Sequence, residues 1–112
     1  MEVKLVNLTP HEIVVLRDDW ELHIPPSGTV ARCETKRVVI GNLNVDGHSV
    51  PVNKTTFGKV DGLPAPAKDT LYIVASLVAQ AVSNRDDLII PDDSVRDDKG
   101  RIIGVKSFAK VN

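Results

Sequence analysis

The chain has few residues that could cross-link its fold. Among its 112 residues Cys33 is the single cysteine, so no disulfide can form within it. Its histidines, His11, His23 and His48, lie in different segments and lack the close ligand spacing of a zinc site. The N-terminal segment has no seven-residue apolar run of the secretory kind. These features predict a cytoplasmic protein.

Long apolar runs, aromatic residues and excess charge are also scarce. The longest uncharged apolar run, Leu71 to Val82, is shorter than the ~20 residues of a membrane span. Four aromatic residues are few for a base-stacking platform, and 14 basic against 15 acidic residues give a net charge of −1. We therefore expect neither a membrane nor a nucleic acid as partner.

What the sequence does contain is aliphatic residues branched at Cβ. Valine occurs 17 times and isoleucine 8 times, and such side chains pack well on a pleated surface. The length suits one domain over residues 1–112, since domains typically hold roughly 100–150 residues. A β-rich single domain is the first prediction.

Glycine, proline and aspartate divide the chain into short strands. Asp46-Gly47 is a two-residue hairpin signal, and Pro51 in the returning strand indicates an edge position or a bulge. A polar loop is expected between Ile90 and Gly100. The expected strands are 3–7, 13–16, 21–24, 29–33, 36–45, 48–56, 71–74, 88–90 and 101–108.

One helix is expected over residues 76–82, where the alanine content is high. Ser76 should cap its N-terminus and Asn84 should close its C-terminus. Its apolar residues cover most of the circumference, so it should be largely buried. The predicted fold class is α+β and predominantly β, a small antiparallel sheet or partly open barrel of short strands with one short buried helix near 76–83.

The tripeptide Arg-Asp-Asp occurs three times, at 17–19, 85–87 and 96–98. Residues 85–99 hold six aspartates and three basic residues, so this segment carries −3 and the rest of the chain +2. Aspartate favours turns, but its carboxylate also binds Ca²⁺ or Mg²⁺. The residue order of an EF-hand loop is absent. We expect capped turns and no metal site, with a divalent-ion site as the alternative, and the arginines could bind phosphate.

Three further features have a functional and a plain interpretation. His11, in the turn after the first strand, is a candidate binding residue. Cys33 could pair with a distant histidine as a nucleophile, but a buried thiol is the commoner situation. Residues 53–59 combine lysines, threonines, Phe57 and Gly58, a mixture that could bind a phosphorylated nucleotide or simply end a strand.

Several segments resemble one family. Leu5-Val6-Asn7-Leu8-Thr9-Pro10-His11-Glu12-Ile13, Thr55-Thr56-Phe57-Gly58-Lys59-Val60-Asp61-Gly62-Leu63-Pro64 and the stretch from Leu71 to Val82 are similar to the small "Asn-Leu-Thr-Pro-His" proteins of phages, prophages and bacteria. The turn 25–32 and the motifs at Arg85 and Arg96 also fit, so the resemblance spans nearly the whole chain. It brings no established active site. It implies a small accessory protein that is encoded by a phage and acts in the host cytoplasm.

The expected function is that of a non-enzymatic binding protein that counters host defence by sequestering a nucleotide-like or phosphorylated small molecule. No catalytic residue and no cofactor are expected, and a homo-oligomer would help to enclose the ligand. The alternatives are a protein–protein inhibitor or minor virion component, and a small metal-dependent nucleotide hydrolase. Phe57 or Tyr72 would stack on the ligand. The expected ligand-binding residues are Asn7, Thr9, His11, Thr55, Thr56, Phe57, Arg85, Asp86, Arg96 and Asp97.

Overall fold

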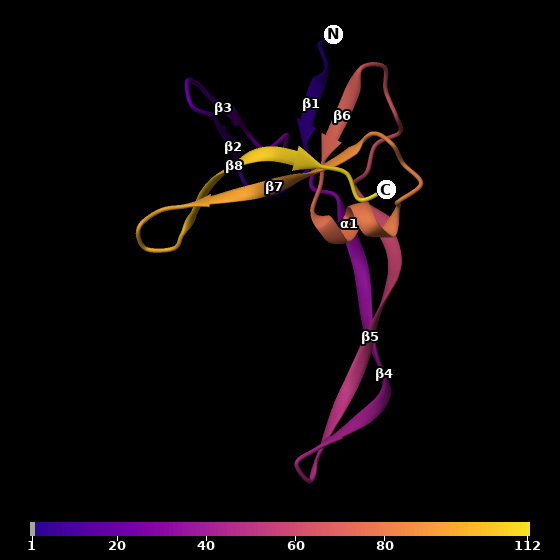
Figure 1. The fold of residues 1–112 in the computed structure, drawn as a ribbon. Coiled ribbons are helices and arrows are strands. Elements are labelled where there is room, and N and C mark those ends of the chain that lie inside the picture. Colours follow the sequence, from indigo (N-terminus) through magenta and orange to yellow (C-terminus); the bar gives the residue numbers. More distant parts are fainter. Residues whose placement is uncertain (1) are drawn as a thin grey trace.

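The computed structural model describes residues 2–112, which form eight strands and one short helix (Figure 1). The helix has six residues and is not long enough to cross a membrane. The elements are β1 (Lys4–Asn7), β2 (Ile13–Leu16), β3 (Glu21–Ile24), β4 (Arg32–Val45), β5 (His48–Asp61), β6 (Thr70–Ile73), α1 (Ser76–Ala81), β7 (Leu88–Arg96) and β8 (Ile102–Ala109).

Six of the strands form a mixed sheet in the order β1-β6-β7-β8-β2-β3. The pairs β1–β6, β6–β7 and β2–β8 are parallel, whereas β7–β8 and β2–β3 are antiparallel hairpins. This body of the protein confirms the predicted class, β-rich with one short helix. Parallel neighbours are separated along the chain, since β2 to β5 lie between β1 and β6, and α1 lies between β6 and β7.

Two apolar clusters hold the body together. One contains Leu8, Val74 and Leu88 and receives Val78 and Ala79 of α1. The other lies on the strands, and its buried members are Ile13, Val15, Ile24, Ile73, Ile89 and Val105. Because β-branched residues dominate the second cluster, the composition of the chain matches the pleated surface that it builds.

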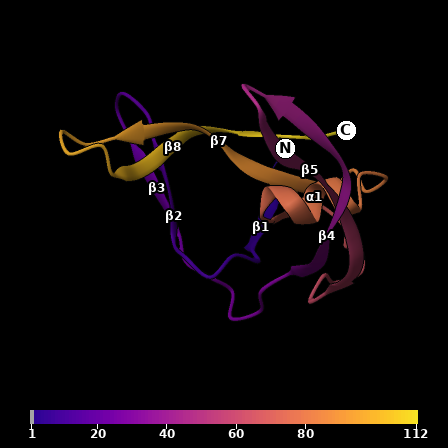
Figure 2. The same ribbon diagram turned by 90° about the horizontal axis from the view of Figure 1, so that it is seen from below.

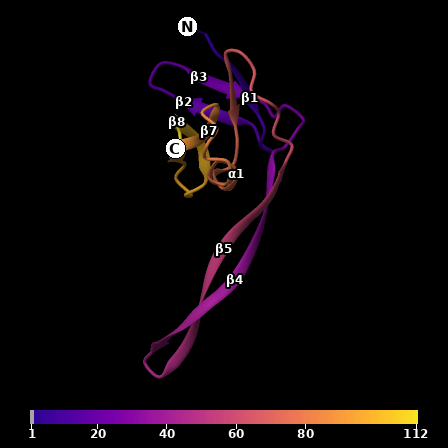
Figure 3. The ribbon, with the colours of Figure 1, turned by 90° about the vertical axis from the view of Figure 1, so that its right-hand side faces the viewer.

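The strands β4 and β5 form a separate two-stranded ribbon, which we call the arm (residues 32–61). The arm leaves the body and extends away from it (Figures 1 and 3). Its turn at Asp46-Gly47 has φ angles of 50° and 80°, the positive values that a two-residue hairpin turn needs. The molecule is consequently long, with extents of 56 × 39 × 24 Å and a Cα radius of gyration of 17.5 Å. A compact chain of this length would have about 13 Å.

The base of the arm is fixed to the body. Cys33, Val60 and Leu63 pack against the cluster that holds α1, and Figure 2 shows α1 beside the bases of β4 and β5. At the exit from the arm Gly62 has a φ of 79°, and a Cβ there would overlap the carbonyl oxygen of Val30. The chain therefore leaves the arm directly beside the point where it entered.

Several local predictions are wrong. The stretch after Ile90 is strand rather than loop, because β7 continues to Arg96 and pairs with β8 through Asp92↔Ser107 and Ser94↔Val105. Ser76 does not cap the helix. The N-cap is Ala75 without a side-chain bond, and the Ser76 hydroxyl instead accepts a hydrogen bond from Gln80.

The other end of the helix also differs from the sequence-based prediction, since it closes at Val82 rather than Asn84. The helix is buried on one side only. Val78 and Ala79 are buried, whereas Leu77 is 48% exposed.

Candidate functional site

The Asn-Leu-Thr-Pro-His segment is built around the side chain of Asn7, which is 1% exposed. Its amide nitrogen donates to the carbonyl oxygens of His11 (2.8 Å) and Ile24 (3.0 Å). Its amide oxygen accepts from the Thr9 backbone N–H (3.0 Å) and hydroxyl (2.6 Å). An asparagine side chain has two N–H donors and two oxygen lone pairs, so all four positions are used. Asn7 and Thr9 thus fasten the turn between β1 and β2 to the end of β3, and the His11 side chain is exposed.

Arg85 is also held by its neighbours, through three of its five N–H donors. Its guanidinium donates to both carboxylate oxygens of Asp87 at 2.7 Å and to the Pro64 carbonyl at 3.0 Å. It also lies over the Tyr72 ring, 6.0 Å from the centroid. The paired guanidinium and its charge lower the pKa of Asp87 below its ordinary value. This pair joins the β5–β6 connector to the start of β7, and Asp86 accepts from Asn112 near the C-terminus.

Arg96 is the last residue of β7, and Asp97 begins the turn between β7 and β8. The Asp97 carboxylate accepts from the backbone N–H groups of Lys99 and Arg101, both at 2.9 Å, and from the Arg101 side chain. These bonds to the charged carboxylate lower its pKa. Arg96 donates to the Gly100 carbonyl at 2.7 Å. These hydrogen bonds of Arg96 and Asp97 therefore all stay within residues 96–101.

The arginines of the three Arg-Asp-Asp tripeptides all donate to the backbone. Arg17 donates to the Lys106 carbonyl, Arg85 to Pro64 and Arg96 to Gly100. Only the Arg96 bond stays within its own turn, whereas the other two join different segments of the chain. Within residues 2–112 no three His, Cys, Asp or Glu side chains gather closely enough to hold a metal ion. His23 instead bridges Glu12 and Glu21, at 3.1 and 3.0 Å.

A hollow of about 470 Å³ lies near the base of the arm, and we call it the arm pocket. Its lining residues are Glu34, Thr35, Lys36, Thr56, Phe57 and Gly58. A register shift falls here, because two residues of β5 lie opposite Glu34 between the pairs Cys33↔Val60 and Thr35↔Phe57. Such a bulge bends and twists a strand, so residues from both faces of the ribbon reach one hollow.

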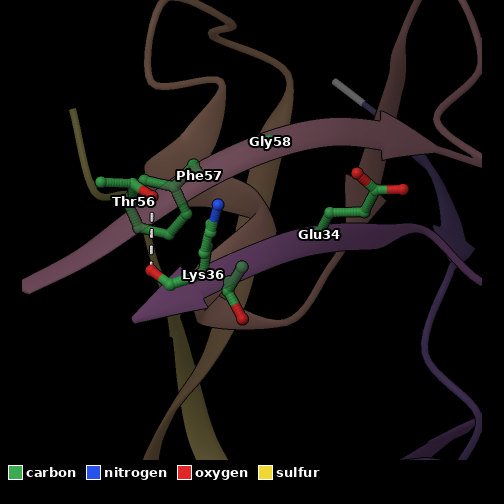
Figure 4. Close-up of a pocket in the computed structure, with 6 residues that line it drawn as sticks. Glu34, Lys36, Thr56, Phe57 and Gly58 are labelled. Carbon is green, nitrogen blue, oxygen red and sulfur yellow. Dashed lines mark hydrogen bonds between the residues drawn. The ribbon is translucent and has the colours of Figure 1, made fainter. Parts of the chain in front are cut away.

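The arm pocket combines a cation, a hydroxyl and an aromatic ring. Figure 4 shows Glu34 at one end and Thr56 with Phe57 at the other, with Lys36 between them. The Phe57 side chain is 41% exposed, and the Thr56 hydroxyl donates to the Lys36 carbonyl at 3.3 Å, which leaves its oxygen free to accept. In the part of the chain that the structure describes, the ion pairs do not include Lys36 or Lys54. Gly58 adds no side chain to the hollow, and a Cβ at this position would lie only 3.2 Å from Glu34 Cβ.

The predicted binding residues fall into separate places. Thr56 and Phe57 meet in the arm pocket, and Thr55 lies beside them in β5, paired with Arg37. The residues near Asn7 lie in the body at the β1–β2 turn, and the pairs Arg85-Asp86 and Arg96-Asp97 lie at the two ends of β7.

Sequence reasoning missed Lys36 and Glu34. The one available signal was the Asp46-Gly47 turn, from which the cross-strand pairs of the hairpin can be counted. That count places Lys36 opposite Thr56 only if one extra residue is allowed in β4.

Comparison of the chain with protein-family models, curated proteins and solved structures gave no match. The functional argument therefore depends on the geometry of the chain itself, and the resemblance to the Asn-Leu-Thr-Pro-His proteins stays a prediction.

Proposed function

We propose that the protein is a non-enzymatic binding protein that captures a small anionic ligand with a planar group, of the nucleotide class, in the arm pocket. The observation that carries this proposal is the combination of the Lys36 ammonium, the Thr56 hydroxyl and the exposed Phe57 ring in one hollow. A phosphate group would accept charge-assisted hydrogen bonds from Lys36, and a base would stack on Phe57. The hollow has a volume in the range of small-molecule sites.

The chemistry of the lining supports retention of the ligand rather than its conversion. General acid–base catalysis needs a group positioned beside the reacting atom, and Glu34 is the one carboxylate that lines the arm pocket. Glu34 would also repel the negative end of a ligand and thereby orient it toward Lys36. An accessory protein that sequesters a nucleotide signal in the host cytoplasm, as a phage counter-defence protein does, would need this kind of site.

The arginines that seemed suited to phosphate are the weaker candidates. Arg85 already donates to both carboxylate oxygens of Asp87, whose side chain is 17% exposed, so a phosphate there would compete with that carboxylate. Removing one partner of such a pair leaves a charge uncompensated. Lys36 has no such bond to lose, which favours the arm pocket over the acidic segment.

Thermal shift against AMP, cyclic dinucleotides and ADP-ribose derivatives tests the proposal. A ligand at ~100 times its Kd should add ~2.7 kcal/mol to the free energy of unfolding. Phe57→Ala and Lys36→Ala should each weaken binding about tenfold or more, a loss of roughly 1.4 kcal/mol. Lys68→Ala, which removes an exposed charge outside the pocket, is the matched control and should bind as the parent does.

Two results would contradict ligand capture. One is a panel in which no compound raises the unfolding midpoint. The other is equal binding by Lys36→Ala and Lys68→Ala, which would place the ligand elsewhere. Mass spectrometry of the ligand released by denaturation distinguishes storage from hydrolysis, because a stored ligand returns with unchanged mass.

The edge strand β3 supports a second candidate function, binding to another protein as an inhibitor or minor virion component. β3 ends the six-stranded sheet; Trp20, just before it, is 53% exposed and Leu22, within it, is 44% exposed. Edge strands accept an added strand, and tryptophan is enriched in binding hot spots. A partner retained by the parent protein but lost from Trp20→Ser would favour this function, and no retained partner would count against it.

A further inference from the structure

The outer part of the arm has one apolar and one polar face. Side chains of cross-strand partners point to the same face of a ribbon, and this rule divides residues 38–53 into two sets. The polar set is rich in asparagine and contains Asn42, Asn44, Ser49, Pro51 and Asn53, with Val39 as its apolar member. The other set is mainly apolar and also holds His48, opposite Val45; its aliphatic members together with Gly41, which we call the apolar face, are Val38, Gly41, Leu43, Val45, Val50 and Val52. Ile40 is the extra residue at the bulge and has no cross-strand partner.

The apolar face has no cover within the chain. Leu43 is 57% exposed, Val45 50% and Val50 46%. An antiparallel sheet with this alternation normally packs its apolar face on a core, and a lone two-stranded hairpin is only marginally stable in water. The arm extends away from the body (Figures 1 and 3), so the chain does not supply that core itself.

We propose that the apolar face packs against the same face of a second copy of this chain, with the two arms antiparallel. Charge complementarity favours this occupant. The tip of the arm carries Asp46, and the same face nearer the body carries Lys36 and Lys54, for which the structure, over residues 2–112, shows no ion pair. An antiparallel overlay brings each acidic tip toward the basic stretch of the other arm. A parallel overlay would put like charges together.

Gly41 lies near the middle of the apolar face, opposite Val52. An ideal Cβ at Gly41 meets no atom within 4 Å, so the space above it is open in the monomer. In a two-fold arrangement about this point, each Gly41 would face the partner arm and would allow the two ribbons to approach closely. A large side chain there would be harmless to one chain but would separate two.

The size of the face determines how tight the pairing can be. About ten residue pairs at ~3.4 Å make a strip of roughly 35 Å, and two strands give it a width of roughly 10 Å. Two such faces bury on the order of 700 Å², below the ~1,200–2,000 Å² of standard interfaces. We therefore expect a reversible dimer with a Kd of roughly 10 µM to 1 mM. This inference shares Lys36 with the arm pocket, but it does not depend on which ligand the pocket binds.

Sedimentation velocity between about 10 µM and about 1 mM tests the pairing, because that range brackets the expected Kd. The weight-average mass of the parent protein should rise toward that of a dimer. Gly41→Glu should stay monomeric throughout, whereas Asn42→Glu, which adds the same charge on the opposite face, should dimerise as the parent does. Asp46→Asn keeps a turn-forming residue and should weaken the dimer about threefold, with less dependence on salt.

Circular dichroism and thermal unfolding at low concentration verify that the variants are folded, and open space at Gly41 gives a reason to expect this. The proposal is overturned by a parent protein that stays monomeric at ~1 mM, which would leave the face to a different protein. It is also overturned if Gly41→Glu associates like the parent, or if Asn42→Glu dissociates the dimer and Gly41→Glu does not.

Discussion

Buried hydrogen bonding at single residues explains why this chain uses polar side chains in its turns. Asn7 is the one buried polar residue of the described chain, and its four bonds tie together segments separated by up to 17 positions. Buried polar groups are costly to leave unpaired, so such a residue both stabilises the local structure and specifies it. The amino-acid type at position 7 is therefore determined by backbone carbonyls.

Replacing Asn7 by alanine should lower the free energy of unfolding by about 2–4 kcal/mol, because it leaves the Ile24 and His11 carbonyls without their donor. Urea denaturation measures this change. Asn44→Ala, on the exposed polar face of the arm, is the control and should change the value by less than about 0.5 kcal/mol. A loss from Asn7→Ala no larger than from Asn44→Ala would refute this account of the motif.

At the scale of elements, the sequence predicts the short strands well and the long ones incompletely. Ile13–Leu16 and Glu21–Ile24 match the expected bounds because alternating apolar residues and flanking turns coincide there. The continuation of β7 was missed since Pro91, Asp92 and Asp93 are typical loop residues, and only pairing with β8 makes them strand.

The candidate site was predicted only in part, for a related reason. Thr56 and Phe57 could be selected because they are neighbours in a mixed segment. Lys36 joins them across a ribbon with two register shifts, which the sequence does not reveal. The hydrogen bonding of Asn7 and Arg85 was equally inaccessible, because their partners include backbone carbonyls far along the chain.

The contact between β3 and Glu12, in the turn between β1 and β2, should depend on pH through His23. Hydrogen bonds to Glu12 and then Glu21, both carboxylates, raise the pKa of this imidazole above 6.5. Because the folded pKa is raised, the stabilisation is fully present below pH 6.5 and is lost as the pH rises through the folded value. An NMR titration of the His23 ring should give a pKa above 6.5. Glu12→Gln with Glu21→Gln should return it toward the ordinary value, and an unchanged pKa would show that the carboxylates are not its cause.

At the scale of the whole molecule, stability is divided unequally between the body and the arm. The body has two buried clusters, whereas most of the arm has exposed side chains on both faces. Segments with few buried contacts open locally at low free energy. The body should therefore remain folded through motions that separate β4 from β5.

Hydrogen exchange should show this division directly. Amides of residues 38–52 should exchange at least about tenfold faster than those of β6 and β7 in dilute protein, because local opening costs less there. Protection of the arm should increase with protein concentration if two arms pair, whereas protection of β6 should not. Equal protection of arm and body in dilute solution would show that the arm needs no second copy to be stable.

The two ends of the arm lie close together, where Gly62 is next to the Val30 carbonyl. The arm is therefore placed like a segment inserted at one point of the body. Its length can change by matched pairs of residues on β4 and β5 without moving any strand of the six-stranded sheet, since insertions at exposed turns are well tolerated. Related chains could thus differ in reach while sharing the same body. An engineer could likewise extend, shorten or replace residues near Asp46-Gly47 and retain the remainder of the protein.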